Sequence, residues 1–352
     1  MTVPRTAITT TFLLLVFALL GCNASEDQVS PAQPSQDGAP SCEAGLNECG
    51  GCGFGCGLGG ACKKGVCDIP ATVAGAQHDP WTITLDATSV YWTSYDSQAG
   101  AVFKAPLSGG EPSMIAVNQP GAWAIAVDAT NVYWTNSHPT RGTVIKLAIA
   151  GGAPLTIARG LSGPQGIAVD AVNVYWTNVD DGTVMSVPIE SGTPLTLAAG
   201  LMEPQGIAVD AANVYFTSHG DGTVMKVPIG GGTPVQLASG QAGPKDIAVD
   251  ATNVYFANTG DGTLMKLPLV GGEPIQLAAG GNPGDIAVDG THVYWTMGGP
   301  QQSTGVVMKV PIAGGTVEAV AADQRAPWGI AVDQTHVYWT NISAGTVLKT
   351  AK

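Results

Sequence analysis

The sequence predicts an all-β fold, a seven-bladed β-propeller with four antiparallel strands per blade, over residues 69–352. Three observations lead to this prediction. Only 12% of the residues are charged, and the abundance of Gly, Thr, Val and Ala favours strands joined by tight turns. One repeat of about forty residues occurs seven times. The last repeat is one strand short, and a strand-like segment precedes the first repeat.

Each repeat carries a marker aspartate between an (I/V/L)-x-(V/L) run and a V-Y-(W/F) run. The marker aspartates, spaced by 39–44 residues, are Asp86, Asp128, Asp170, Asp210, Asp250, Asp289 and Asp333. In the fourth repeat, PQGIAVD, NVYFTS, TVMKVPI and TPVQLAS are separated by turn residues, so they predict strands A to D of one blade. Four short strands in every copy are typical of propeller blades.

The two ends of the repeat region predict how the ring closes. The last repeat stops after GTVLKTAK, at Lys352, and lacks a strand D. The segment PATVAGAQHDP, which begins at Pro70, has the pattern that precedes strand A in later repeats. We therefore expect this segment to supply strand D of the last blade, a one-plus-three closure that leaves no open edge.

The N-terminal 41 residues predict export and lipid anchoring. Phe12–Leu20 is an apolar run of nine residues, shorter than the ~20 needed to span a bilayer. It ends in LLGC, which resembles the lipobox of bacterial lipoproteins, and the resemblance implies a signal peptide over residues 1–21 and a lipidated Cys22; an ordinary signal peptide is the alternative. Residues 22–41 are rich in Ser, Pro and Gln and predict a flexible tether. We expect a cell-envelope protein anchored at the outer membrane or cell surface.

Residues 42–67 form a small cysteine-rich module. Its six cysteines are Cys42, Cys49, Cys52, Cys56, Cys62 and Cys67. An even cluster in an exported chain predicts three disulfides, whose connectivity the sequence leaves open. Zinc or iron bound at the Cys49-x2-Cys52 pair is the rival interpretation, but the module has no second C-x2-C pair and no histidine.

The V-Y-W-T-N runs resemble the YWTD repeats of the low-density-lipoprotein-receptor class B propellers, and similar repeats occur in NHL and streptogramin-lyase propellers. The resemblance covers residues 69–352 and implies a propeller fold. It departs from the YWTD family in two ways. That family has six blades, whereas this chain has seven repeats, and its terminal Asp is replaced here by Asn136, Asn178, Asn258, Asn341, Ser94, Ser218 or Met297. The partners of the family are therefore not implied.

Function is expected where the repeats differ, because sites are grafted onto a common fold. The residues five positions before the marker aspartates should line the channel mouth on the top face: Trp81, Trp123, Gln165, Gln205, Lys245, Gly284 and Trp328. Blade seven adjoins blade one, so the three tryptophans form one aromatic arc, opposed by the Gln and Lys side chains with Asp246 and Asp285 beside them. Indole faces next to amides and carboxylates suit a sugar ring or an extended peptide. Alternatively, the indoles plug the channel.

These residues predict a binding or scaffold module for a protein, peptide or glycan ligand. A metal-assisted lyase or hydrolase of the streptogramin-lyase or lactonase type is one alternative, and a purely architectural role is another. Aspartates in the B-to-C turns (Asp180, Asp181, Asp221 and Asp261) fit turn chemistry better than a metal site. We predict no catalytic residue, metal ligand or cofactor. A net charge of −13 without a basic patch argues against nucleic acid.

Overall fold

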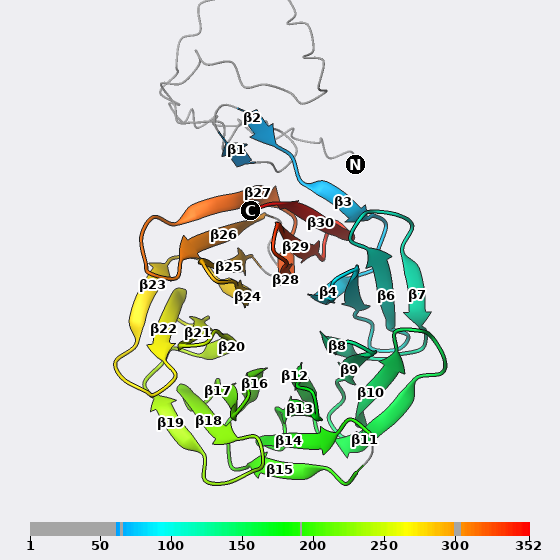
Figure 1. Cartoon of the computed structure of the whole chain (residues 1–352), viewed down its shortest axis with the longest axis vertical. Helices are drawn as coiled ribbons and strands as arrows, with labels where there is room; N and C mark the ends of the chain where they lie inside the picture. Colours follow the sequence, from blue (N-terminus) through cyan, green and yellow to red (C-terminus); the bar gives the residue numbers. More distant parts are fainter. Residues whose placement is uncertain (1–60, 64–65, 191, 299–303) are drawn as a thin grey trace, which may run out of the picture. The chain divides into compact units, whose positions relative to one another are not determined.

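The computed structural model describes residues 61–63, 66–190, 192–298 and 304–352. Seven four-stranded antiparallel sheets surround a central channel (Figure 1), so the predicted all-β propeller with seven blades is confirmed. The signal peptide, the tether and Cys42, Cys49, Cys52 and Cys56 lie outside the described residues. β1 (Ala61–Lys63) and β2 (Val66–Asp68) form a hairpin that sets Cys62 opposite Cys67 in the backbone register. Among the described residues, no helix is long and apolar enough to cross a membrane.

Each blade consists of strands A to D, from the channel outward. The A strands are β4 (Pro80–Leu85), β8 (Ala122–Val127), β12 (Pro164–Val169), β16 (Pro204–Val209), β20 (Pro244–Val249), β24 (Pro283–Val288) and β28 (Pro327–Val332). The B strands are β5 (Ser89–Ser94), β9 (Asn131–Asn136), β13 (Asn173–Asn178), β17 (Asn213–Ser218), β21 (Asn253–Asn258), β25 (His292–Met297) and β29 (His336–Asn341). The C strands are β6 (Ala101–Pro106), β10 (Gly142–Ala148), β14 (Thr183–Pro188), β18 (Thr223–Pro228), β22 (Thr263–Pro268), β26 (Gly305–Pro311) and β30 (Thr346–Ala351). The D strands are β7 (Ser113–Ala116), β11 (Leu155–Leu161), β15 (Leu195–Ala198), β19 (Val235–Ala238), β23 (Ile275–Ala279), β27 (Glu318–Gln324) and β3 (Ala71–Ala74).

The ring closes as the ends of the repeat region predict. β3 pairs antiparallel with β30 as the outermost strand of blade seven, with Ala71 opposite Lys349 and Ala74 opposite Val347. This one-plus-three arrangement joins the first strand of the propeller to the last. Ala71 lies at the end of the blade where β30 finishes, so the chain enters the propeller on the face opposite the start of β28.

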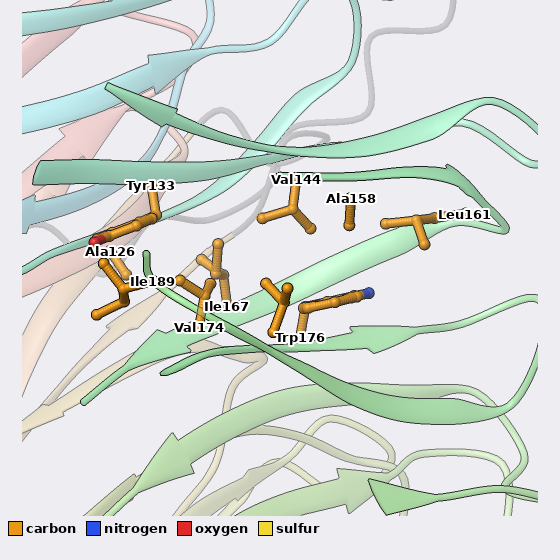
Figure 2. Close-up of a cluster of buried hydrophobic side chains, with 10 residues drawn as sticks. Ala126, Tyr133, Val144, Ala158, Leu161, Ile167, Val174, Trp176 and Ile189 are labelled. Atoms are coloured by element: carbon orange, nitrogen blue, oxygen red, sulfur yellow. The ribbon is translucent and has the colours of Figure 1, made fainter. Parts of the chain in front are cut away.

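The hydrophobic core lies between neighbouring blades. Figure 2 shows the junction of blades two and three, where Tyr133 and Val144 of blade two share a cluster with Val174 and Trp176 of blade three. The same contact recurs around the ring, because the tyrosine of each V-Y-(W/F) run packs toward the tryptophan or phenylalanine of the next blade. The aromatic residues of the repeat are therefore core residues that hold blades together.

The marker aspartates stabilise the turns from strand A to strand B. In blade three, Asp170 Oδ1 accepts hydrogen bonds from the main-chain N–H groups of Val172 and Asn173, both at 2.7 Å, and Oδ2 accepts one from the Tyr175 hydroxyl at 2.7 Å. The tyrosine bond occurs in every blade. The expectation that the marker aspartates serve the turn is confirmed.

Candidate functional site

The channel holds a cavity of about 430 Å³ that residues from the A strands of all seven blades line. Its side chains form two tiers. The upper tier, which we call the channel mouth, consists of residues four and five positions before the marker aspartates. The lower tier is a ring of seven buried isoleucines, Ile83, Ile125, Ile167, Ile207, Ile247, Ile286 and Ile330. Polar groups at the channel mouth therefore stand directly above an apolar ring.

A repeated irregularity of the A strands places the channel-mouth residues. In each blade, the register between strands A and B shifts at the two channel-mouth positions, as it does between Pro164 and Ile167. A threonine from strand B bridges the shift: Thr177 Oγ1 accepts a hydrogen bond from Gly166 N at 3.0 Å and donates one to the Gln205 carbonyl of the next blade at 2.8 Å. Bulges of this kind re-aim side chains next to functional sites.

The three tryptophans of the predicted arc meet, but their roles differ. The ring centroid of Trp81 lies 5.0 Å from Trp123 and 5.0 Å from Trp328. Trp81 and Trp328 are buried, at 9% and 8% exposure, whereas Trp123 is half-buried. Trp123 and Trp328 line the cavity, and Trp81 supports both rings without lining it. Trp123 is thus the most accessible indole of the arc.

Tyr95 extends this aromatic cluster and was not among the predicted site residues. Its ring lies 5.4 Å from that of Trp81 and makes an edge-to-face contact with Trp123 at 5.6 Å. Tyr95 directly follows β5, in the B-to-C loop of blade one. Of the other six repeats, only one has an aromatic ring at that position, the imidazole of His219. This difference between the repeats is the sequence signal that could have identified Tyr95 as a site residue.

Three ionisable residues face the aromatic cluster across the channel, and we call them the charged wall: Lys245, Asp246 and Asp285. Lys245 Nζ lies 3.6 Å from the ring centroid of Trp328, a cation–π contact that spans blade six, where Gly284 occupies the equivalent position without a side chain. Asp246 Oδ2 accepts a hydrogen bond from the main-chain N–H of Ile286 at 2.7 Å. Asp285 lines the cavity beside them. Within the described part of the chain, Lys245 forms no salt bridge and the Asp285 carboxyl accepts no hydrogen bond.

Burial dominates the electrostatics of this wall. It raises the pKa of Asp285 to about 8, and the nearby charge of Asp246 adds to the rise while Lys245 opposes it. Burial likewise raises the pKa of Asp246, against its main-chain hydrogen bonds and Lys245. It lowers the pKa of Lys245, against both carboxylates. Burial therefore favours the uncharged form of all three groups, and the attraction between Lys245 and the two carboxyls opposes it.

The remaining predicted residues fall into two groups. Gln165 and Gln205 line the cavity from blades three and four. Two of the turn aspartates are engaged locally: Asp221 Oδ2 accepts hydrogen bonds from Met202 N and the Ser218 hydroxyl, and Asp261 accepts from Thr263. Across the described ranges, no group of three or more His, Cys, Asp or Glu side chains is arranged to hold a metal ion.

Several solved structures share this fold. Virginiamycin B lyase from Staphylococcus aureus is similar with 14% identity and a TM-score of 0.68, covering 80% of this chain and 98% of that chain. A chain of a nidogen/laminin complex has 22% identity and a TM-score of 0.52, covering 64% of this chain and 90% of that chain. The computationally designed protein Ika8 has 16% identity and a TM-score of 0.59, with 80% and 98% covered.

No family model matches the chain, and no curated protein matches it. At these identities the likeness to the solved structures shows the propeller fold alone. The resemblance to YWTD and NHL repeats stays a prediction.

Proposed function

We propose that this chain is a lipid-anchored cell-envelope protein whose propeller binds a protein, peptide or glycan ligand at the channel mouth. The observation that carries the proposal is the cavity itself. It sets an accessible indole, Trp123, and two amide side chains opposite Lys245 and Asp285, whose polar atoms have unused hydrogen-bonding capacity. An apolar surface with a few converging polar groups is the usual composition of a ligand site.

The structural neighbours support a binding role. A catalytically inactive virginiamycin B lyase was solved with quinupristin, and a matching chain was solved as part of a nidogen/laminin complex. We carry over to this chain only the proposal that its propeller binds a ligand.

Anchoring and orientation belong to the same proposal. The chain enters blade seven on the face opposite the channel mouth, at Ala71. A lipid on Cys22, a tether over residues 22–41 and a disulfide-stapled module over residues 42–67 would then hold the propeller with its mouth directed away from the membrane. That orientation leaves the cavity accessible to an external ligand.

Substitution of Trp123 tests the binding role. Trp123→Ala removes the accessible indole but leaves Trp81 and Trp328 in contact. We expect full-length Trp123→Ala to lose retention on glycan and peptide arrays that the wild type shows, by about tenfold or more, since central aromatic anchors contribute about 2 kcal/mol. Val172→Ala is the control, because Val172 is exposed in the A-to-B turn of blade three, away from the mouth. Equal retention of both variants would refute a site at the channel mouth.

An enzymatic role is the second candidate. The carboxyls of Asp246 and Asp285 share one cavity, and the pKa of Asp285 is raised further than that of Asp246, the kind of separation that acid–base catalysis uses. Metal-assisted chemistry is tested separately. Metal analysis of the purified protein and the effect of EDTA on its melting temperature would reveal a bound ion.

A further inference from the structure

Among the described residues, most repeated charged side chains of this propeller form hydrogen bonds with neighbouring groups, whereas Lys245 and Asp285 do not. Lysines of strand C donate across blade junctions: Lys146 Nζ to the Ile189 carbonyl at 2.9 Å and Lys226 Nζ to the Leu269 carbonyl at 2.7 Å. The marker aspartates are equally engaged by main-chain N–H groups and tyrosine hydroxyls. In the described ranges, Lys245 Nζ makes a cation–π contact with Trp328 but no hydrogen bond or salt bridge, and the Asp285 carboxyl has no hydrogen-bond donor.

Both polar groups remain accessible from the cavity. Neither Lys245 nor Asp285 is fully buried, and both line the space above the isoleucine ring. Asp246 is different, because its carboxylate already bonds Ile286 N across the junction of blades five and six. A half-buried ionisable group without a hydrogen bond is unfavourable, so a ligand that supplies the missing hydrogen bonds has a matching place to bind.

The missing partners define the ligand's chemistry. Lys245 needs an acceptor, and Asp285 can accept or, when protonated, donate. A hydroxyl group meets both needs because it donates one hydrogen bond and accepts two. A cationic ligand would meet the Lys245 ammonium, whereas an anionic ligand would meet Asp246 and a chain of net charge −13. A neutral, hydroxyl-bearing ligand fits best.

The rest of the cavity fits a ring that carries several hydroxyls. Trp123 offers a partly exposed indole against which the C–H face of a ring can pack. Gln165 and Gln205 each offer a carbonyl and an amide on adjacent blades. The volume of about 430 Å³ lies in the lower part of the range for compact ligands, and an extended peptide would have to lie across the mouth instead.

We infer that the ligand, given the binding function proposed above, is a neutral saccharide unit. Its hydroxyls accept from the Lys245 ammonium and pair with the Asp285 carboxyl, while its ring packs against Trp123.

The experiment measures retention of the full-length protein on an array of neutral, sialylated and sulfated oligosaccharides and on an array of acidic and basic peptides. We expect retention on neutral oligosaccharides. Asp285→Ala and Lys245→Met should each lower the affinity about tenfold, whereas Asp285→Asn, which keeps a donor and an acceptor, should stay close to the wild type. Glu318→Gln makes the same carboxyl-to-amide change as Asp285→Asn, but on the outermost strand β27, and should bind like the wild type.

The other outcomes separate the two proposals. Retention on basic peptides, lost equally in Asp285→Asn and Asp285→Ala, would show ionic recognition and overturn the saccharide inference, while binding at the mouth would stand. Retention on acidic peptides or charged glycans would overturn it in the same way. No retention on either array would count against both the saccharide inference and the binding function.

Discussion

The hydroxyl of Thr340, in blade seven, donates a 2.6 Å hydrogen bond to the main-chain carbonyl of Trp81, in blade one, across 259 positions of the chain. This bond is the closing member of a repeated set. Equivalent threonines join five of the other six junctions: Thr93 to Trp123, Thr135 to Gln165, Thr177 to Gln205, Thr217 to Lys245 and Thr296 to Trp328. The acceptors are channel-mouth residues, so the bonds that join the blades also position the candidate site.

Thr340→Val tests the closing bond. The fully buried Thr340 hydroxyl also accepts a hydrogen bond from Gly329 N at 2.9 Å, so the substitution leaves two buried main-chain groups without that partner. We expect the free energy of unfolding to fall by about 1–3 kcal/mol and the melting temperature to fall by a few degrees, measured by denaturant and thermal unfolding. Thr196→Val, on the exposed face of β15, is the matched control and should leave both values unchanged. A Thr340 variant as stable as the control would contradict the role of this bond.

The marker aspartates predict destabilisation by acid. Burial alone would raise the pKa of Asp333, but hydrogen bonds from Thr335 N, His336 N and the Tyr338 hydroxyl outweigh it and lower the pKa to about 2. A carboxyl whose folded pKa is below its unfolded value of about 3.9 stabilises the fold above that value. This stabilisation is lost as the pH falls from about 4 towards 2.

Five other marker aspartates also have a lowered pKa, so we expect their losses to accumulate in this window. Asp333→Asn should be less stable than the wild type at pH 7 and should lose less stability between pH 4 and pH 2. Urea unfolding at a series of pH values measures both quantities. Glu273→Gln changes an exposed carboxyl and should follow the wild-type curve. Parallel curves for Asp333→Asn and the wild type would count against the prediction.

Asp285 predicts a pH dependence of the opposite sign. Its folded pKa of about 8 lies above the unfolded value, so the native state binds more protons between about pH 4 and pH 8. This group therefore lowers stability progressively as the pH rises through that range. Asp285→Asn should flatten the profile and unfold at a higher denaturant concentration than the wild type at pH 8. The prediction fails if the two profiles coincide from pH 5 to pH 8.

The repeat pattern predicts the fold because every copy contains the same turn and strand signals. The marker aspartate, the V-Y-(W/F) run and the Gly-containing hairpins specify one blade, and the incomplete last copy implies the partner of β30. The repeat also identifies the channel-mouth positions, because it aligns Trp123 and Lys245 at the same place in their blades. Alignment along a strand was sufficient for these conclusions.

Contacts across the channel could not be predicted in this way. The three tryptophans Trp81, Trp123 and Trp328 occupy equivalent positions in the repeat, but in the structure Trp81 packs against the other two rings and does not line the cavity. The reach of Lys245 to Trp328 depends on the curvature of the ring and on the bare position at Gly284. Such contacts join different blades at the same height, and a repeat carries no information about which neighbours meet there.

Ala257 lies at the one blade junction that lacks the threonine hydrogen bond, and Asp246 of the charged wall forms a hydrogen bond across this junction. Ala257 occupies the position of the bridging threonine in blade five, so the junction to Gly284 in blade six has no hydroxyl bond, and Asp246 supplies a bond to Ile286 N instead. At the six other junctions the threonine is fully buried, so the fold accommodates that side chain. We expect Ala257→Thr to donate to the Gly284 carbonyl and to raise the free energy of unfolding by about 0.5–1.5 kcal/mol.

The same substitution in an Asp246→Asn background distinguishes two explanations. If Asp246 replaces the missing threonine, Asp246→Asn alone should destabilise the protein, and Ala257→Thr should recover most of that loss in the double variant. Thermal unfolding of the four proteins, as a double-mutant cycle, measures the coupling directly. Additive effects would mean that the carboxylate of Asp246 does not substitute for the hydroxyl, and its place beside Lys245 and Asp285 would then serve the cavity alone.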